Sequence, residues 1–133
     1  MDDLAAAWLN STRNLASVLL NISDPETADR LSSGPINGWI GIREIYFTFD
    51  DFYHNGEPGD KPANFQGLPV EIDERLMRFK MALRELAKVG RAAEDREIVK
   101  SPIWRNLQSE AGALAQGIMK RLQVEQASLK RFF

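Results

Sequence analysis

The chain has 133 residues, of which 44% are hydrophobic and 27% are charged, and this balance is typical of a single soluble globular domain spanning residues 1–133. It contains no cysteine, which excludes disulfides, thiolate metal sites and cysteine nucleophiles. The net charge of −2 is divided unevenly, because residues 1–70 contain four basic and ten acidic side chains, whereas residues 71–133 contain thirteen basic and nine acidic ones.

The first 35 residues predict two helices. Apolar side chains recur at helical spacing over residues 3–22, and Ser23-Asp24-Pro25 then supplies a capping side chain and a proline suited to a first turn. A short second helix is expected to end near Gly34. Because the N-terminus is acidic and no apolar stretch approaches the roughly 20 residues of a membrane span, we expect no targeting segment, no membrane association and a cytoplasmic location.

Residues 39–54, WIGIREIYFTFDDFYH, are rich in aromatic and β-branched residues, which favour strands. Neither alternating face of such a strand is uniformly apolar, whereas helical spacing gathers the apolar side chains into one arc of about 140°. The residues of this arc are Trp39, Ile42, Ile45, Tyr46, Phe49, Phe52 and Tyr53. The pattern therefore predicts a central helix with a broad core face, followed by a glycine- and proline-rich loop over residues 55–69.

From residue 70 the apolar positions predict two long helices. The first stripe steps by three and four residues from Ile72 to Gly90, and we expect its helix to run to about Lys100. Ser101 can cap the next helix and Pro102 can begin it, with an apolar stripe that continues to the C-terminus. The sequence thus predicts an all-α fold, a small bundle of about five helices with a long C-terminal antiparallel helical hairpin.

The predicted hairpin also suggests an assembly. Two helices of about thirty residues would each be roughly 45 Å long. This exceeds the width of a compact domain of 15.0 kDa. We therefore expect a homodimer, since a second copy would cover the projecting part.

The side of the central helix opposite its core face carries charged residues together with an apolar pair. Ile40 and Phe47 are seven residues apart, so they lie on nearly the same line along a helix. An apolar line among charged side chains indicates contact with another molecule, although a helix buried on both sides would show the same pattern. We therefore predict a non-catalytic protein–protein interaction or regulatory module, with partner-binding residues Ile40, Arg43, Phe47, Asp51, His54 and Phe65.

One alternative is a small-molecule or nucleotide binder, including a metal-dependent phosphohydrolase. Its pocket would lie between the central helix and the hairpin and be lined by Trp39, Tyr46, Tyr53 and Trp104. The carboxylate pairs Glu71/Glu74 and Glu94/Glu97 are of the kind that binds Mg²⁺, but on one continuous helix they would be about 30 Å apart. The motif search finds no catalytic triad and no phosphate-binding loop, so we assign no catalytic residue and no cofactor.

Two further possibilities concern metal and nucleic acid. Asp50 and His54 are four residues apart, but one histidine without cysteine makes a weak metal motif, and we predict no metal site. A basic stripe on the first long helix, Lys80, Arg84, Lys88 and Arg91, could meet phosphates. The sequence pI of about 5.5 is lower than nucleic-acid-binding domains usually have, so a nucleic-acid partner is the least favoured alternative.

Overall fold

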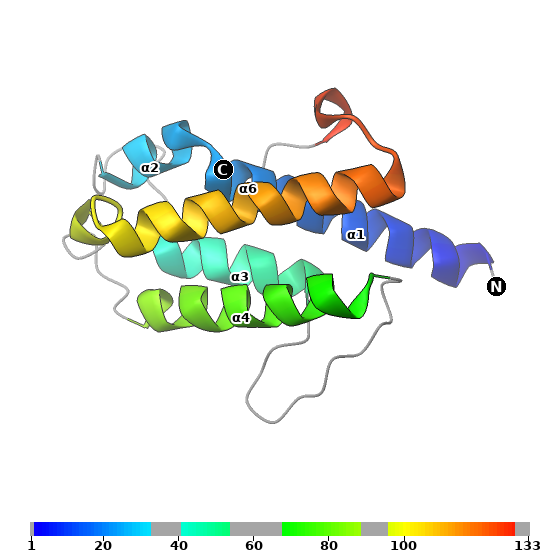
Figure 1. Cartoon of the computed structure of the whole chain (residues 1–133), viewed down its shortest axis with the longest axis horizontal. Coiled ribbons are helices and arrows are strands. Elements are labelled where there is room, and N and C mark those ends of the chain that lie inside the picture. The colour runs from blue at the N-terminus through cyan, green and yellow to red at the C-terminus, as the bar shows by residue number, and fades with distance from the viewer. Residues whose placement is uncertain (1, 33–40, 54–67, 89–95, 130–133) are drawn as a thin grey trace.

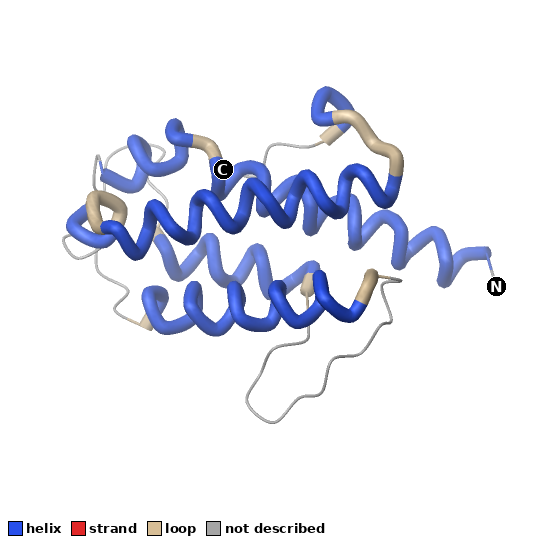
Figure 2. Tube along the Cα trace, in the orientation of Figure 1, coloured by secondary structure: helices blue, strands red, loops and turns tan. Residues whose placement is uncertain are grey.

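The computed structural model describes residues 2–32, 41–53, 68–88 and 96–129, and within these ranges every regular element is helical (Figure 2). The elements are α1 (Asp2–Ser23), α2 (Pro25–Ser32), α3 (Ile42–Phe52), α4 (Val70–Ala87), α6 (Pro102–Leu122) and the 3-10 helix η2 (Gln126–Ser128). The predicted all-α fold is confirmed. The four longest helices form a bundle, with α3 beside α4 and α1 beside α6, while α2 and η2 lie at its periphery (Figure 1).

The first two helices follow the capping pattern of the sequence. α1 ends at Ser23, and the Asp24 carboxylate accepts a hydrogen bond of 3.0 Å from the Glu26 amide in the first turn of α2. The buried Thr27 hydroxyl donates to the Asn21 carbonyl oxygen at 2.7 Å, which ties α2 back to the end of α1. These local bonds fix the turn between the two helices.

The most extensive helix contact is between α1 and α6, which come from opposite ends of the chain. Both helices bury small residues where they meet, such as Ala16 on α1 and Ala111 and Ala115 on α6. A Cβ added at Gly112 would lie 3.4 Å from the Cβ of Ser23, so α6 passes within van der Waals contact of the end of α1 at this position. This contact organises one side of the core.

The central helix forms as predicted, between Gly41 and Tyr53. Its buried residues come from the predicted core arc, namely Ile42, Ile45, Tyr46 and Phe49, with Tyr53 directly after the helix and Phe52 partly buried. The Phe49 ring packs against Phe79 of α4, with 5.4 Å between ring centroids. α3 therefore contacts both α1 and α4 with its buried face, while its opposite face is exposed.

The two C-terminal helices are shorter than the sequence suggested. α4 ends at Ala87 with Lys88 in a turn, so the expected continuous helix to Lys100 is not formed. This end lies just before Gly90, and glycine is a poor helix former. Ser101 caps α6 as predicted, its hydroxyl accepting from the Trp104 amide at 3.4 Å, and α6 ends at Gln123, which has a left-handed φ of 56°.

These lengths alter the expectation about assembly. α4 has 18 residues and α6 has 21, which correspond to helices of about 27 and 32 Å. Helices of this length fit within the bundle, because α6 is covered by α1 and α4 is covered by α3. The expected length of about thirty residues for each helix is therefore wrong, and the homodimer stays a prediction that the helix lengths no longer support.

Candidate interaction surface

The exposed side of α3 carries three residues spaced by one helical turn. Arg43, Phe47 and Asp51, which we call the α3 outer face, are all exposed, and 56% of the surface of Phe47 is accessible. Neither the Arg43 nor the Asp51 side chain forms a hydrogen bond or an ion pair with another residue in the described ranges. The face thus presents a large apolar ring between a positive and a negative group.

The two ends of α3 are fixed by hydrogen bonds. At the N-terminus, the Gly41 amide donates to the Glu44 carboxylate at 3.0 Å, as in a capping box. At the C-terminus, the Tyr53 amide donates to the Phe49 carbonyl oxygen at 3.0 Å, and the Ser11 hydroxyl on α1 lies 3.5 Å from the Phe52 carbonyl oxygen. A short helix held at both ends presents its outer face in a defined orientation.

A buried lysine joins α3 to α4. Lys80 is only 1% exposed, and its ammonium donates to the Tyr53 carbonyl oxygen at 2.9 Å and lies 2.5 Å from the Asp50 carboxylate. Its Nζ is also 5.8 Å from the centroid of the Tyr53 ring, within the range of a cation–π contact. Burying a lysine is costly unless its charge is paired and its donors are satisfied, and these contacts meet that requirement.

A second buried pair lies next to Lys80. The Tyr53 hydroxyl donates to Asp73 Oδ1 at 2.6 Å and lies 3.0 Å from the Asp73 carbonyl oxygen. Tyr53 is fully buried and Asp73 is 3% exposed. Along α3 the contacts move from Asp50 to Tyr53, and their partners on α4 move back from Lys80 to Asp73. The two helices therefore run in opposite directions, and these contacts fix their register.

The residue that follows Lys80 on α4 is apolar and exposed. Met81 follows Lys80 and is 49% exposed, and Phe47 is one turn from Asp50. Successive helical residues differ by about 100°, so Met81 lies on the outer side of α4 while Lys80 points inward. Phe47 and Met81 are two of the exposed large apolar residues in the described part of the chain.

Several predicted partner-binding residues have no described position. Ile40, His54 and Phe65 lie outside the described residues, as do Trp39 of the predicted pocket and Arg91 of the basic stripe. Of the predicted apolar pair, Ile40 and Phe47, only Phe47 therefore lies in the described part of the chain. Of Asp50 and His54, which form only a weak metal motif, the described part likewise contains Asp50 alone.

The predicted basic stripe is wrong at Lys80. Its side chain is buried against α3, whereas Arg84 is partly exposed and Lys88 is exposed. Lys88 pairs with Glu85 at 2.8 Å, and this hydrogen bond lowers the pKa of the Glu85 carboxyl. Lys80 therefore belongs to the interior of the bundle and not to a phosphate-binding surface.

The aromatic residues proposed for a ligand pocket belong to the core. Tyr53 and Trp104 are fully buried and Tyr46 is 8% exposed. They lie among the large side chains of the hydrophobic core, and the cavities described next are lined by other residues. Sequence periodicity identified them as apolar but could not distinguish packing from ligand contact.

The structure shows a groove that the sequence did not suggest. It lies between α4 and α6 and has a volume of about 600 Å³. Among the described residues it is lined by Arg75, Arg78, Phe79, Ala82, Ile103, Asn106, Leu107 and Glu110. A smaller cavity of about 420 Å³ lies between the α1–α2 turn and η2. The exposed Ile103 of α6 and the small Ala82 of α4 both line this groove. The sequence contains both residues but does not reveal that they are neighbours, because they lie on different helices.

Within the described ranges no group of three or more His, Asp or Glu side chains is arranged to hold a metal ion. No helix of the described part is both long and apolar enough to cross a membrane. Comparison with protein-family models, with curated proteins and with solved structures finds no match for this chain.

Proposed function

We propose that the protein is a non-catalytic interaction module that pairs with a second copy of itself through the α3 outer face. The observation that carries the proposal is the order of the three exposed residues, with Phe47 midway between Arg43 and Asp51. Arg43 and Asp51 are each four residues from Phe47, so their Cα atoms are equally far from that of Phe47 along the helix.

This order is complementary to itself. If two copies of α3 meet antiparallel about a two-fold axis at Phe47, Arg43 of each copy faces Asp51 of the other. A two-fold interface uses the same patch twice, so one favourable contact is made two times. The two Phe47 rings meet at the centre, and a buried aromatic anchor surrounded by polar groups is the usual composition of an interaction hot spot.

The surface around α3 supports a weak and reversible dimer. Met81 on the neighbouring helix α4 is a further exposed apolar side chain. Two short helices offer less area than the roughly 1,200–2,000 Å² of a standard stable interface, and smaller interfaces are typical of transient complexes. We therefore expect a dimer that dissociates on dilution.

The test is a charge exchange measured by sedimentation or light scattering over a range of protein concentrations. R43D and D51R should each abolish the dimer, because each places like charges opposite each other twice. The double variant R43D/D51R should restore dimerisation, since the pairs are re-formed with opposite polarity. F47E should give a monomer at all concentrations.

Val70→Glu provides a matched control. Val70 is 54% exposed and lies in the first turn of α4, ten residues or about 15 Å from Lys80 along the helix. This variant adds the same charge as F47E but away from the α3 outer face, and it should leave the dimer unchanged. A native protein that stays monomeric at millimolar concentration, or a double variant that fails to recover, contradicts the proposal.

A further inference from the structure

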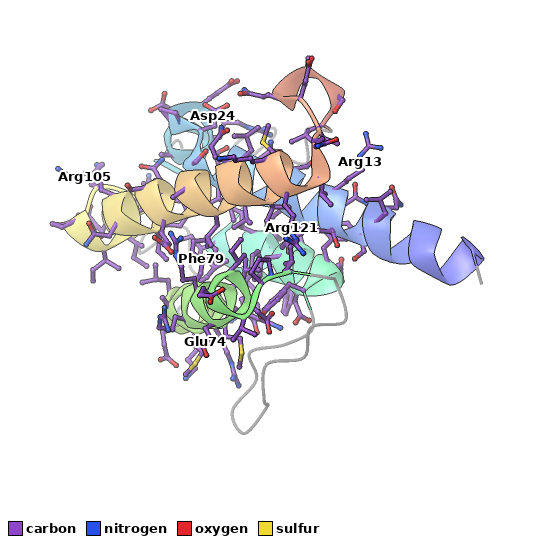
Figure 3. All side chains as sticks on the ribbon, turned by 45° about the vertical axis from the view of Figure 1, so that its right-hand side comes forward. Arg13, Asp24, Glu74, Phe79, Arg105 and Arg121 are labelled. Carbon is purple, nitrogen blue, oxygen red and sulfur yellow. The ribbon has the colours of Figure 1, made fainter. Side chains whose placement is uncertain are left out.

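The groove between α4 and α6 combines an apolar floor with charged walls. Phe79 and Leu107 form its floor and are almost fully buried, whereas Ile103 at its edge is 58% exposed. Phe79 lies between the two helices, while Glu74 points away from α4 on the opposite side (Figure 3). The groove thus exposes apolar side chains at a helix boundary that the bundle leaves incompletely filled.

The groove exists because the two helices are in limited contact there. α4 and α6 meet much less extensively than α1 and α6. Ala82 faces the groove one turn after Phe79, and its small side chain leaves the space open. Arg75 of α4 reaches Glu110 of α6 at 2.8 Å, which links the two walls and limits their separation.

The charges along the walls are unequal. Arg75 is neutralised by Glu110, and their hydrogen bond raises the pKa of the Arg75 guanidinium. Arg78 is exposed and forms no hydrogen bond or ion pair with another described residue. The Arg78 guanidinium is therefore a positive charge without an ion-pair partner among the described residues, and it lies beside the apolar floor of the groove.

The size and the charge together define a ligand class. A volume of about 600 Å³ lies within the usual range of roughly 300–1,000 Å³ for small-molecule sites, which are mostly apolar with a few polar groups. A guanidinium binds a carboxylate through charge-assisted hydrogen bonds. An occupant that fits both features has an apolar body and one terminal carboxylate.

We propose that the α4–α6 groove binds a small amphipathic monocarboxylate, with its apolar body on Phe79, Leu107 and Ile103 and its carboxylate at Arg78. This site is on a different helix pair from the α3 outer face and does not depend on dimerisation. Asn106 lies on the groove wall and offers the carboxylate an amide donor.

The experiment compares three ligands of equal chain length with the full chain, namely decanoate, decylammonium and decanol, below their aggregation concentrations. Isothermal titration should show saturable binding of decanoate at one site and at least tenfold weaker binding of decylammonium. The methyl resonances of Ile103 and Leu107 should shift on addition of decanoate. Equal affinity for the two charged ligands, or shifts confined to other residues, would overturn the proposal.

Three variants locate the contacts. Arg78→Gln should weaken decanoate binding about tenfold or more, because a hydrogen bond to a charged group is lost. Arg105→Gln is the matched control, since Arg105 is exposed on α6 outside the groove lining, and it should bind decanoate normally. Ala82→Phe fills the groove from an exposed position and should abolish binding.

The remaining outcomes are equally decisive. Unchanged binding by Arg78→Gln or by Ala82→Phe shows that decanoate lies elsewhere and refutes the site. Binding of an acidic amphipathic peptide without any binding of decanoate shows that the groove is a protein-docking surface and also refutes it. F47E should bind decanoate with native affinity, so failure of the dimer proposal is distinguishable from failure of this one.

Discussion

Lys80 shows how a single residue can change role between sequence and structure. On a helical projection it belongs to a basic stripe, yet its ammonium is buried between Asp50 and the Tyr53 carbonyl oxygen. A long aliphatic stem lets lysine cross an apolar interface before its charge finds a partner. Here the partner is half-exposed, since 41% of the Asp50 side chain is accessible.

We predict that Lys80→Ala lowers the free energy of unfolding by about 2–4 kcal/mol, because it removes the packing and contacts of a buried side chain and leaves the Tyr53 carbonyl oxygen without this donor. Lys88→Ala, directly after the last residue of the same helix, is the matched control. Its partner Glu85 is exposed, and solvent screens such a pair, so this variant should leave the free energy of unfolding nearly unchanged. Urea denaturation followed by circular dichroism measures both. Equal effects of the two variants would falsify a stabilising role for the buried contacts.

At the scale of the helices, α6 has two glycines in different surroundings. A Cβ would be 3.4 Å from Ser23 Cβ at Gly112 and 3.8 Å from Ile72 Cδ1 at Gly117, so both positions have room for a methyl group, but the neighbour of Gly112 is closer. Glycine in a helix is less favourable than alanine by about 1 kcal/mol. The two positions therefore separate helix propensity from helix packing.

We predict that Gly117→Ala raises the free energy of unfolding by about 0.5–1 kcal/mol, because it gains helix propensity without a clash. Gly112→Leu should lower it by about 1–3 kcal/mol, because the larger side chain forces α6 away from the end of α1. Thermal denaturation of both variants is the measurement. If Gly112→Leu were as stable as the native chain, the close approach of α1 and α6 would not contribute to stability.

The elements that the sequence predicted well are those with a regular apolar pattern. The core face of α3, the Ser101 cap and the extent of α1 follow from spacing and capping chemistry. The end of α4 at Ala87 does not, because the apolar stripe continues through Leu86 to Gly90 and periodicity carries no information on where hydrogen bonding stops. The pattern left open whether Phe47 is exposed or lies in a helix buried on both sides, and the structure exposes it.

The whole molecule depends on contacts between distant parts of the chain, and these limit prediction from sequence. The α4–α6 groove and the Lys80 contacts both join residues more than twenty positions apart, so no local pattern reveals them. The charge asymmetry of the two halves is visible in the sequence. Its structural counterpart is that α1, from the acidic half, packs on α6, from the basic half.

We predict that a chain lacking residues 2–23 loses cooperative unfolding, because α6 then exposes the face that α1 covers. The buried side of α6 includes Ala111, Leu114, Ala115 and Ile118, and α1 is the helix with which α6 makes its most extensive contact. Urea denaturation should show a broad, low-amplitude change in helicity in place of a sharp transition. A truncated chain that unfolds sharply, with the midpoint of the full chain, contradicts this view of the α1–α6 contact.

The burial of Lys80 also has a chemical consequence. An amine reacts with acylating reagents only when it is uncharged and reachable, and the described structure encloses this amine while it leaves Lys88, Lys100 and Lys120 open to solvent. Acylation of the exposed lysines proceeds from the folded chain, whereas acylation of Lys80 requires α3 and α4 to separate first. The rate of Lys80 acylation therefore measures how often α3 and α4 separate in the folded protein.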